Sequence, residues 1–153
     1  MMTEREHRLV RYRTGFAAVQ DALRGATDAE LDRDQGGGEW TAHQVAHHLA
    51  DSEAMAYIRL RRLVAEDQPV IQAYDEPEWA RRLHYDRPIE PSLAVLRAVR
   101  EASLQLLERL TAEEWQRGGT HTESGPYSVD DWLSIYSEHS HDHADQIRRA
   151  IGR

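Results

Sequence analysis

The chain contains no cysteine, only one phenylalanine and no long apolar run. Without cysteine it can form no disulfide, no thiolate nucleophile and no thiolate metal ligand, so any metal ion must be bound through nitrogen or oxygen. No apolar segment approaches the roughly 20 residues of a membrane-spanning helix, and the first residues lack the apolar stretch of a signal peptide. We therefore expect a soluble, cytoplasmic protein with no membrane partner.

Basic residues are also in short supply, with 19 Lys and Arg against 27 Asp and Glu and a formal net charge of −8 at pH 7. A phosphate backbone would be repelled by this surface, so we expect no nucleic-acid partner. A chain of 153 residues fits one domain. Such a domain is large enough to bury roughly 70% of the surface that its unfolded form exposes. We therefore expect residues 1–153 to form a single domain.

Apolar residues recur at helical spacing in four segments, and convincing period-two alternation is found nowhere. The first segment ends before Gly25, while the second and fourth begin at possible capping boxes, Thr41 with Gln44 and Ser128 with Asp131. The predicted helices cover residues of about 4–24, 41–66, 93–110 and 128–151. Four amphipathic helices of this length predict an all-α protein with the architecture of a four-helix bundle.

Two connections contain the residues that break regular structure. Residues 69–91 hold four prolines and only one short helical stretch, around Trp79, so we predict a long crossover between the second and third helices. A connection of more than about 15 residues is uncommon in a compact domain unless it covers a pocket or makes an interface. The second connection, from Gly118 to Pro126, is rich in glycine and is predicted to be a loop.

Histidine is the one residue type in conspicuous supply, with nine copies in the chain. Three of them fall between positions 43 and 48, and three between 139 and 143. On a helical wheel, His139 and His143 lie on the apolar face of the fourth helix, one turn and about 6 Å apart along the axis. His141 points toward water. The fourth helix therefore offers a pair of imidazoles to the interior of the bundle.

The second helix adds one more inward imidazole. His48 lies at the edge of its apolar stripe, whereas His43 and His47 are predicted to point outward. A buried imidazole without a partner is costly, and a shared metal ion would give all three inward rings a partner. Bundle cores build metal sites from facing helices in this way. A histidine on an apolar face is also often a hydrogen-bonded core residue, and that alternative stays open for each ring alone.

The residues around these histidines resemble the DinB-like superfamily. The matching segments are Trp40-Thr41, His48-Leu49-Ala50-Asp51-Ser52-Glu53, Tyr136, His139, His143 and Gln146-Ile147. Further positions are similar to its branch of YfiT-like metal-dependent hydrolases and bacillithiol transferases: Pro69, Tyr74-Asp75-Glu76, Trp79-Ala80, His121, Glu123 and Gly125. The resemblance covers residues of about 10 to 151. It implies a four-helix bundle, often a homodimer, with a nickel or zinc ion in the core and an active site that opens at one end.

The resemblance also implies roles for individual residues. It makes His48, His139 and His143 the metal ligands. It also matches Arg59 to an arginine that faces the substrate pocket, with a solvated arginine next to Arg61 and Arg62 as the alternative. The fourth helix departs from the common pattern, because many YfiT-like proteins carry adjacent histidines where this chain has Asp142-His143. This departure leaves the ligand in place and puts its surroundings in question.

Three neutral imidazoles on a divalent ion leave at least one coordination position for water or substrate. The ion would activate either water or the sulfur of a low-molecular-weight thiol cofactor. The first hypothesis is therefore a metal-dependent enzyme that acts on a small molecule, as a thiol S-transferase of the bacillithiol or mycothiol type or as a hydrolase. The alternative is a non-catalytic bundle in which the ion joins the helices, closed by a fourth protein ligand such as Glu53. No catalytic residue is assigned.

Five further side chains are weaker candidates. Glu53 and Asp51 either orient a ligand histidine through its free N–H or are simply solvated. Trp79, together with Tyr74, either walls the substrate pocket or caps the core. His121, beside Glu123, is a candidate for the pocket, with a surface histidine as the alternative.

Overall fold

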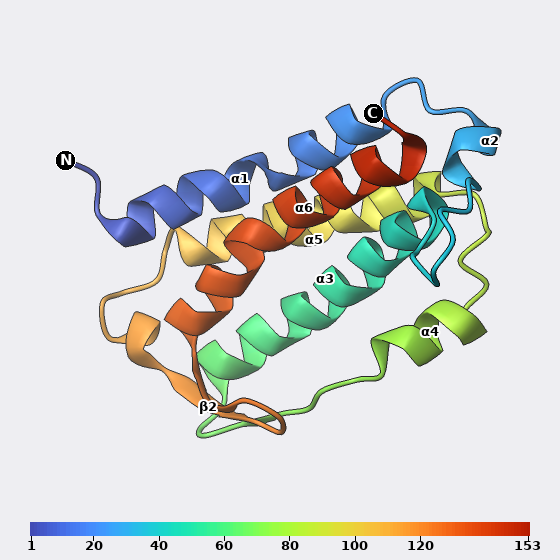
Figure 1. Cartoon of the computed structure of the whole chain (residues 1–153). Helices are drawn as coiled ribbons and strands as arrows, with labels where there is room; N and C mark the ends of the chain where they lie inside the picture. Colours follow the sequence, from blue (N-terminus) through green and yellow to red (C-terminus); the bar gives the residue numbers. More distant parts are fainter.

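The computed structural model describes residues 1–153 and consists mainly of four long helices (Figure 1). These are α1 (Glu4–Leu23), α3 (Ala42–Ala65), α5 (Glu90–Leu107) and α6 (Val129–Ile151). Helices α5 and α6 each pack against both α1 and α3, so α1 and α3 occupy opposite corners of the bundle. This arrangement confirms the predicted all-α four-helix bundle. No helix is long and apolar enough to cross a membrane.

Three of the four long helices begin at a capping box, whereas α5 begins without a side-chain cap. Both predicted capping boxes are present: the Thr41 side chain accepts from Gln44 N and the Ser128 side chain accepts from Asp131 N. A third capping box, formed by Thr3 with Glu6, begins α1. Each box satisfies backbone N–H groups that the first helical turn leaves without partners. The starts of α3 and α6, the two helices with the histidine clusters, are therefore fixed by neighbouring residues.

The crossover between α3 and α5 lies along the outer side of α3 (Figure 1). It contains a short strand, β1 (Val70–Ile71), and the predicted short helix near Trp79, α4 (Glu76–Arg82). Hydrogen bonds attach it to α3: His47 Nε2 lies 2.7 Å from the Arg87 carbonyl oxygen, and the Tyr85 hydroxyl donates to Asp51 Oδ2 at 2.6 Å. Near β1, Arg59 and Arg62 of α3 donate to the carbonyl oxygens of Gln72 and Val70. The crossover therefore gives α3 a second buried face.

This second face corrects one prediction. His43 and His47 do not point to solvent, because their residues are 8% and 0% exposed. His47 Nδ1 also lies 2.7 Å from Ser92 Oγ, so both nitrogens of this ring have partners. His43 Nδ1 lies 2.6 Å from Asp32 Oδ1, next to the short helix α2 (Asp28–Leu31). Both histidines therefore fix loops to α3 and are not solvated.

A three-stranded sheet at one end of the bundle is absent from the prediction. After a 3-10 turn, η1 (Glu114–Gln116), strand β2 (Gly118–His121) pairs in parallel with β1 and antiparallel with β3 (Gly125–Ser128). The strands are only two to four residues long, too short to show alternation. The glycines that favoured a loop instead permit close pairing, since a Cβ on Gly119 would collide with the backbone of Pro69.

The interior has two apolar clusters with a polar layer between them. One cluster contains Leu49 and Ile147, and the other contains Leu60 and Trp132. Between the clusters α6 carries only polar residues, and α3 contributes the buried polar residues Ser52 and Glu53. The buried polar side chains of this layer are Ser52, Glu53, Arg100, Ser103, Ser137 and Ser140. Of the four tryptophans, Trp115 and Trp132 are buried and the other two are partly buried.

Candidate metal centre

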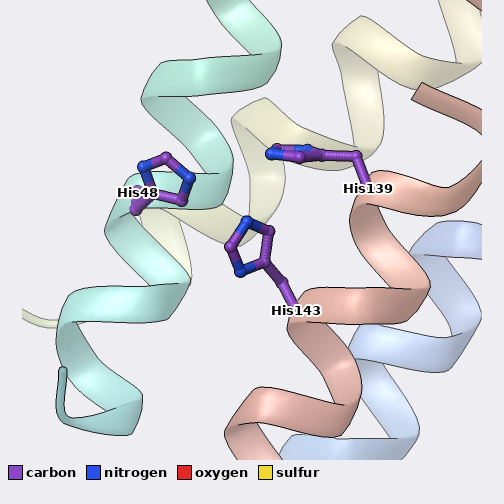
Figure 2. Close-up of side chains that lie close together, drawn as sticks. All are labelled: His48, His139 and His143. Atoms are coloured by element: carbon purple, nitrogen blue, oxygen red, sulfur yellow. The ribbon is translucent and has the colours of Figure 1, made fainter. Parts of the chain in front are cut away.

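The structure brings His48 of α3 together with His139 and His143 of α6. The His48 ring centroid lies 5.7 Å from that of His139 and 4.8 Å from that of His143, and the last two are 4.6 Å apart. One nitrogen from each ring lies within 4.8 Å of the other two. Figure 2 shows the three rings directed toward the space between the two helices. Helical spacing on α6 and the packing of α3 against it therefore produce the convergence that the sequence predicts.

Burial keeps two of these rings neutral. It is the main cause that lowers the pKa of His48 from 6.5 to about 3 and that of His143 from 6.5 to about 4. The neighbouring imidazoles lower both values further. Protonation of either ring would place a positive charge in a poorly solvated interior beside two other rings. At neutral pH both therefore keep the nitrogen lone pair that a metal ligand needs.

Hydrogen bonds orient two of the rings. His143 Nδ1 lies 2.7 Å from Gln146 Oε1, and His139 Nδ1 lies 3.3 Å from Glu53 Oε1. Because an oxygen acceptor holds the proton on Nδ1, the lone pair of each ring is on Nε2. Glu53 thus contacts the far side of the His139 ring. Asp51, the other carboxylate considered for this role, accepts from Tyr85 instead.

His48 supplies the test of whether this donor set fits a metal ion. It is only 2% exposed, its ring packs against Trp40 with centroids 4.9 Å apart, and neither ring nitrogen has a hydrogen-bond partner in the protein. These nitrogens are not completely enclosed by protein, so they remain accessible to an ion between the rings. Three neutral ring nitrogens therefore face one another, and no protein group donates a proton to the nitrogen of His48. Such a donor set fits a divalent ion bound through nitrogen.

Glu53 does not close the site as a fourth ligand would. It is 2% exposed, which excludes the solvated alternative, and both its oxygens accept from Arg100 Nη1, at 2.5 and 2.8 Å. The sequence prediction missed Arg100, although its position indicates burial. Arg100 lies on the same face of α5 as the buried residues Leu96, Ser103 and Leu107. A charged residue on such a face indicates a buried ion pair.

A polar cavity of about 680 Å³ lies where the crossover meets the sheet. Its lining includes Arg59, Tyr74 and His121, three residues that the sequence analysis considered for the pocket. Arg59 Nη1 donates to the Tyr136 hydroxyl at 3.4 Å, and the Tyr136 ring lies 5.5 Å from that of His139. The cavity is therefore connected to the histidines through one aromatic side chain.

Trp79 does not line this cavity. Its ring packs on that of Tyr74 with centroids 4.4 Å apart, so it contacts the cavity only through a residue of the lining. The Tyr74 hydroxyl is buried and has no hydrogen-bond partner, and burial raises its pKa to about 12. The cavity wall beside Arg59 therefore contains a phenol that is protonated at neutral pH.

Comparison with known proteins identifies the family. The pattern that defines the DinB superfamily matches residues 11–147. A relative from Oceanobacillus iheyensis is 42% identical over 118 residues, which are 77% of this chain and 69% of the relative. YfiT from Bacillus subtilis is 35% identical over 134 residues, 86% of this chain and 75% of that protein. Both bear the name "putative metal-dependent hydrolase". The chain belongs to the DinB superfamily, and its relatives are YfiT-like.

Solved structures agree with this assignment. The structure of Bacillus subtilis YfiT, described as having an unusual four-helix bundle topology, superposes with a TM-score of 0.89 at 29% identity. The match covers 98% of this chain and 88% of that one. A mycothiol-dependent maleylpyruvate isomerase superposes with a TM-score of 0.70 at 17% identity, over 93% of this chain and 60% of the isomerase. At that identity the second likeness shows the fold alone.

Proposed function

We propose that the chain is a metal-dependent hydrolase that binds one divalent ion, zinc or nickel, through His48, His139 and His143. The observation that carries the proposal is the convergence of three imidazole nitrogens within 4.8 Å of one another, one of them on a buried ring without a partner. Similarity to proteins named as metal-dependent hydrolases supports the same role.

The surroundings of the histidines favour an enzyme over a metal that only joins helices. The nearest carboxylate, Glu53, is occupied by Arg100 and contacts His139 through Nδ1, so it leaves the ion's remaining positions open. Three protein ligands with one open position are typical of catalytic sites. A bound ion would supply a water molecule acidified to a pKa of about 7, and hence a hydroxide nucleophile at neutral pH.

The chain's own residues would bind the substrate in the cavity at the sheet end. Arg59 provides a guanidinium for an anionic group of the substrate. The cavity volume of about 680 Å³ accommodates a small organic molecule. A second candidate is S-transfer from a low-molecular-weight thiol to a small electrophile, which the volume of the same cavity would also accommodate. In that reaction a thiol would replace water as the activated nucleophile.

Metal reconstitution tests the proposal. Protein stripped by a chelator and reloaded with zinc or nickel is assayed against a panel of esters and amides, with and without a low-molecular-weight thiol and a chromogenic electrophile. We expect turnover that requires the metal and is abolished in His143→Ala. His141→Ala is the matched control, since this ring contacts Arg11 O of α1 and should leave activity unchanged. Activity that survives chelation and His143→Ala contradicts the proposal.

A further inference from the structure

The polar layer of the core contains a side chain from a helix that provides no histidine to the site. Arg100 of α5 is 3% exposed, and its guanidinium lies over the Tyr12 ring with 4.0 Å from Cζ to the ring centroid. Nη2 donates to the Tyr12 carbonyl oxygen at 2.6 Å, while Nη1 donates to both oxygens of Glu53. Arg100 is therefore held by α1 at one nitrogen and binds α3 through the other.

The carboxylate that Arg100 holds also contacts a metal-site histidine. Glu53 Oε1 lies 3.3 Å from His139 Nδ1 and accepts from Ser140 Oγ at 3.4 Å. The same oxygen is the one 2.5 Å from Arg100 Nη1. The guanidinium thus fixes the position of the atom that faces the His139 ring.

We propose that Arg100 is a positioning residue for the metal centre, acting through Glu53 on His139, and that Gly15 of α1 provides the space that it occupies. The inference rests on the proposed role of His139 as a ligand. A carboxylate held at one place selects the Nδ1–H tautomer of the ring and its rotation, so that Nε2 faces the ion. All four long helices then contribute to metal binding, although only α3 and α6 provide ligands.

Gly15 leaves room for the Arg100 guanidinium against the backbone of α1. A Cβ at this position would lie 2.9 Å from Arg100 Cζ and 3.0 Å from Ser140 Cβ, and still closer to Nη2. The first two distances are already shorter than ordinary van der Waals contact, and the guanidinium is held on its other sides. Gly15→Ala would therefore displace Arg100 without changing any charge.

Stability alone does not explain a buried pair of this kind. Moving two charges out of water costs about as much as their attraction returns, so apolar residues of similar volume often replace buried ion pairs without loss of stability. A positioning role and a purely structural role therefore make different predictions for the variant Glu53→Met/Arg100→Met, which removes both charges and keeps the volume.

The test compares metal affinity in four proteins by competition with a chromophoric zinc chelator: the full chain, Glu53→Met/Arg100→Met, Gly15→Ala and the control Arg97→Gln. Arg97 lies on the same helix but pairs with Glu101 at the surface. We expect zinc affinity to fall about 10- to 100-fold in Glu53→Met/Arg100→Met and in Gly15→Ala, the range seen when a hydrogen-bond partner of a ligand histidine is changed. Zinc affinity should stay unchanged in Arg97→Gln. Unfolding by denaturant, measured in parallel, reports whether each variant is folded.

A second readout keeps the inference testable if the double variant folds poorly. Gly15→Ala changes no charge, and nitrogen NMR of the His139 ring in this variant should show loss of the single Nδ1–H tautomer present in the unchanged protein. Zinc affinity and tautomer that match the unchanged protein in folded Glu53→Met/Arg100→Met or Gly15→Ala would overturn the role of Arg100 and leave the three-histidine site intact. Zinc affinity unchanged in His48→Ala would instead contradict the proposed function itself.

Discussion

His48 and His143 lie edge to face across the interface between α3 and α6, with ring centroids 4.8 Å apart and planes at 68°. Burial is the main cause that lowers the pKa of both rings, and His143 also lowers the pKa of His48. The pair therefore prefers the uncharged state whether or not an ion is present. This preference has a measurable effect on the stability of the metal-free protein.

The metal-free protein should lose stability as the pH falls below 6.5. In the unfolded chain both histidines take up a proton near pH 6.5, whereas in the folded chain they do so only near pH 3 and 4. Between these values the unfolded state binds more protons, so acid favours unfolding. We expect the free energy of unfolding to be about 2–4 kcal/mol lower at pH 5 than at pH 7, measured by urea denaturation after chelation.

The variant His143→Gln serves as the control for this pH dependence. It removes one of the two depressed groups, so its free energy of unfolding should change less between pH 7 and pH 5. Equal stability of the metal-free protein at both pH values would show that the two rings are not buried as neutral imidazoles.

Removal of the Tyr85 hydroxyl should loosen the crossover. Tyr85→Phe deletes the 2.6 Å hydrogen bond to Asp51, and a bond to a charged acceptor contributes about 1.5–3 kcal/mol. Because Asp51 is partly exposed, we expect a loss near the lower limit. Hydrogen exchange should increase at residues 83–89 and stay unchanged in α1. An equal increase in hydrogen exchange throughout the chain would contradict the view that Tyr85 attaches only the crossover to α3.

Arg59 should affect substrate binding more than turnover. It faces the cavity rather than the histidines, so Arg59→Gln is expected to raise KM roughly tenfold, the effect of about 1.4 kcal/mol, and to change kcat little. Arg62→Gln is the control, because this residue bonds Glu66 at the surface. A fall in kcat with KM unchanged would place Arg59 at the reacting atoms instead.

Gly119 should be the sensitive position of the small sheet. Gly119→Ala forces a Cβ against the backbone of Pro69, and overpacking of this kind costs about 1–3 kcal/mol in the free energy of unfolding. Thr120→Ala, at the exposed neighbouring position, should cost less. Thermal unfolding of the two variants checks the difference, and equal stability would argue against the parallel pairing of β1 with β2.

The long helices and the convergence of the histidines could be predicted because both depend on local rules. Capping by Thr41 and Ser128 specifies where α3 and α6 start, and a period of 3.6 residues sorts His139 and His143 from His141. A helix in a bundle has one obvious buried face, and the three inward rings lie on such faces. Nothing distant in the chain is needed for these predictions.

The surroundings of the histidines depend on contacts that a helical wheel does not contain. On the wheel His47 is exposed because the wheel shows α3 alone, whereas in the fold Arg87 of the crossover and Ser92 of α5 cover it. The sheet escaped prediction because its strands are short and pair segments far apart in sequence. Glu53 and Arg100 lie on the apolar stripes of their helices, and that placement is the one sequence signal for their ion pair.

The metal content of the purified protein tests the central claim most directly. Elemental analysis should find one divalent ion per chain in the unchanged protein and in the control His141→Ala. It should find essentially none in folded His48→Ala and His143→Ala, because each substitution leaves only two of the three nitrogens that converge in the core. Equal metal content in all four proteins would contradict a site built from His48, His139 and His143.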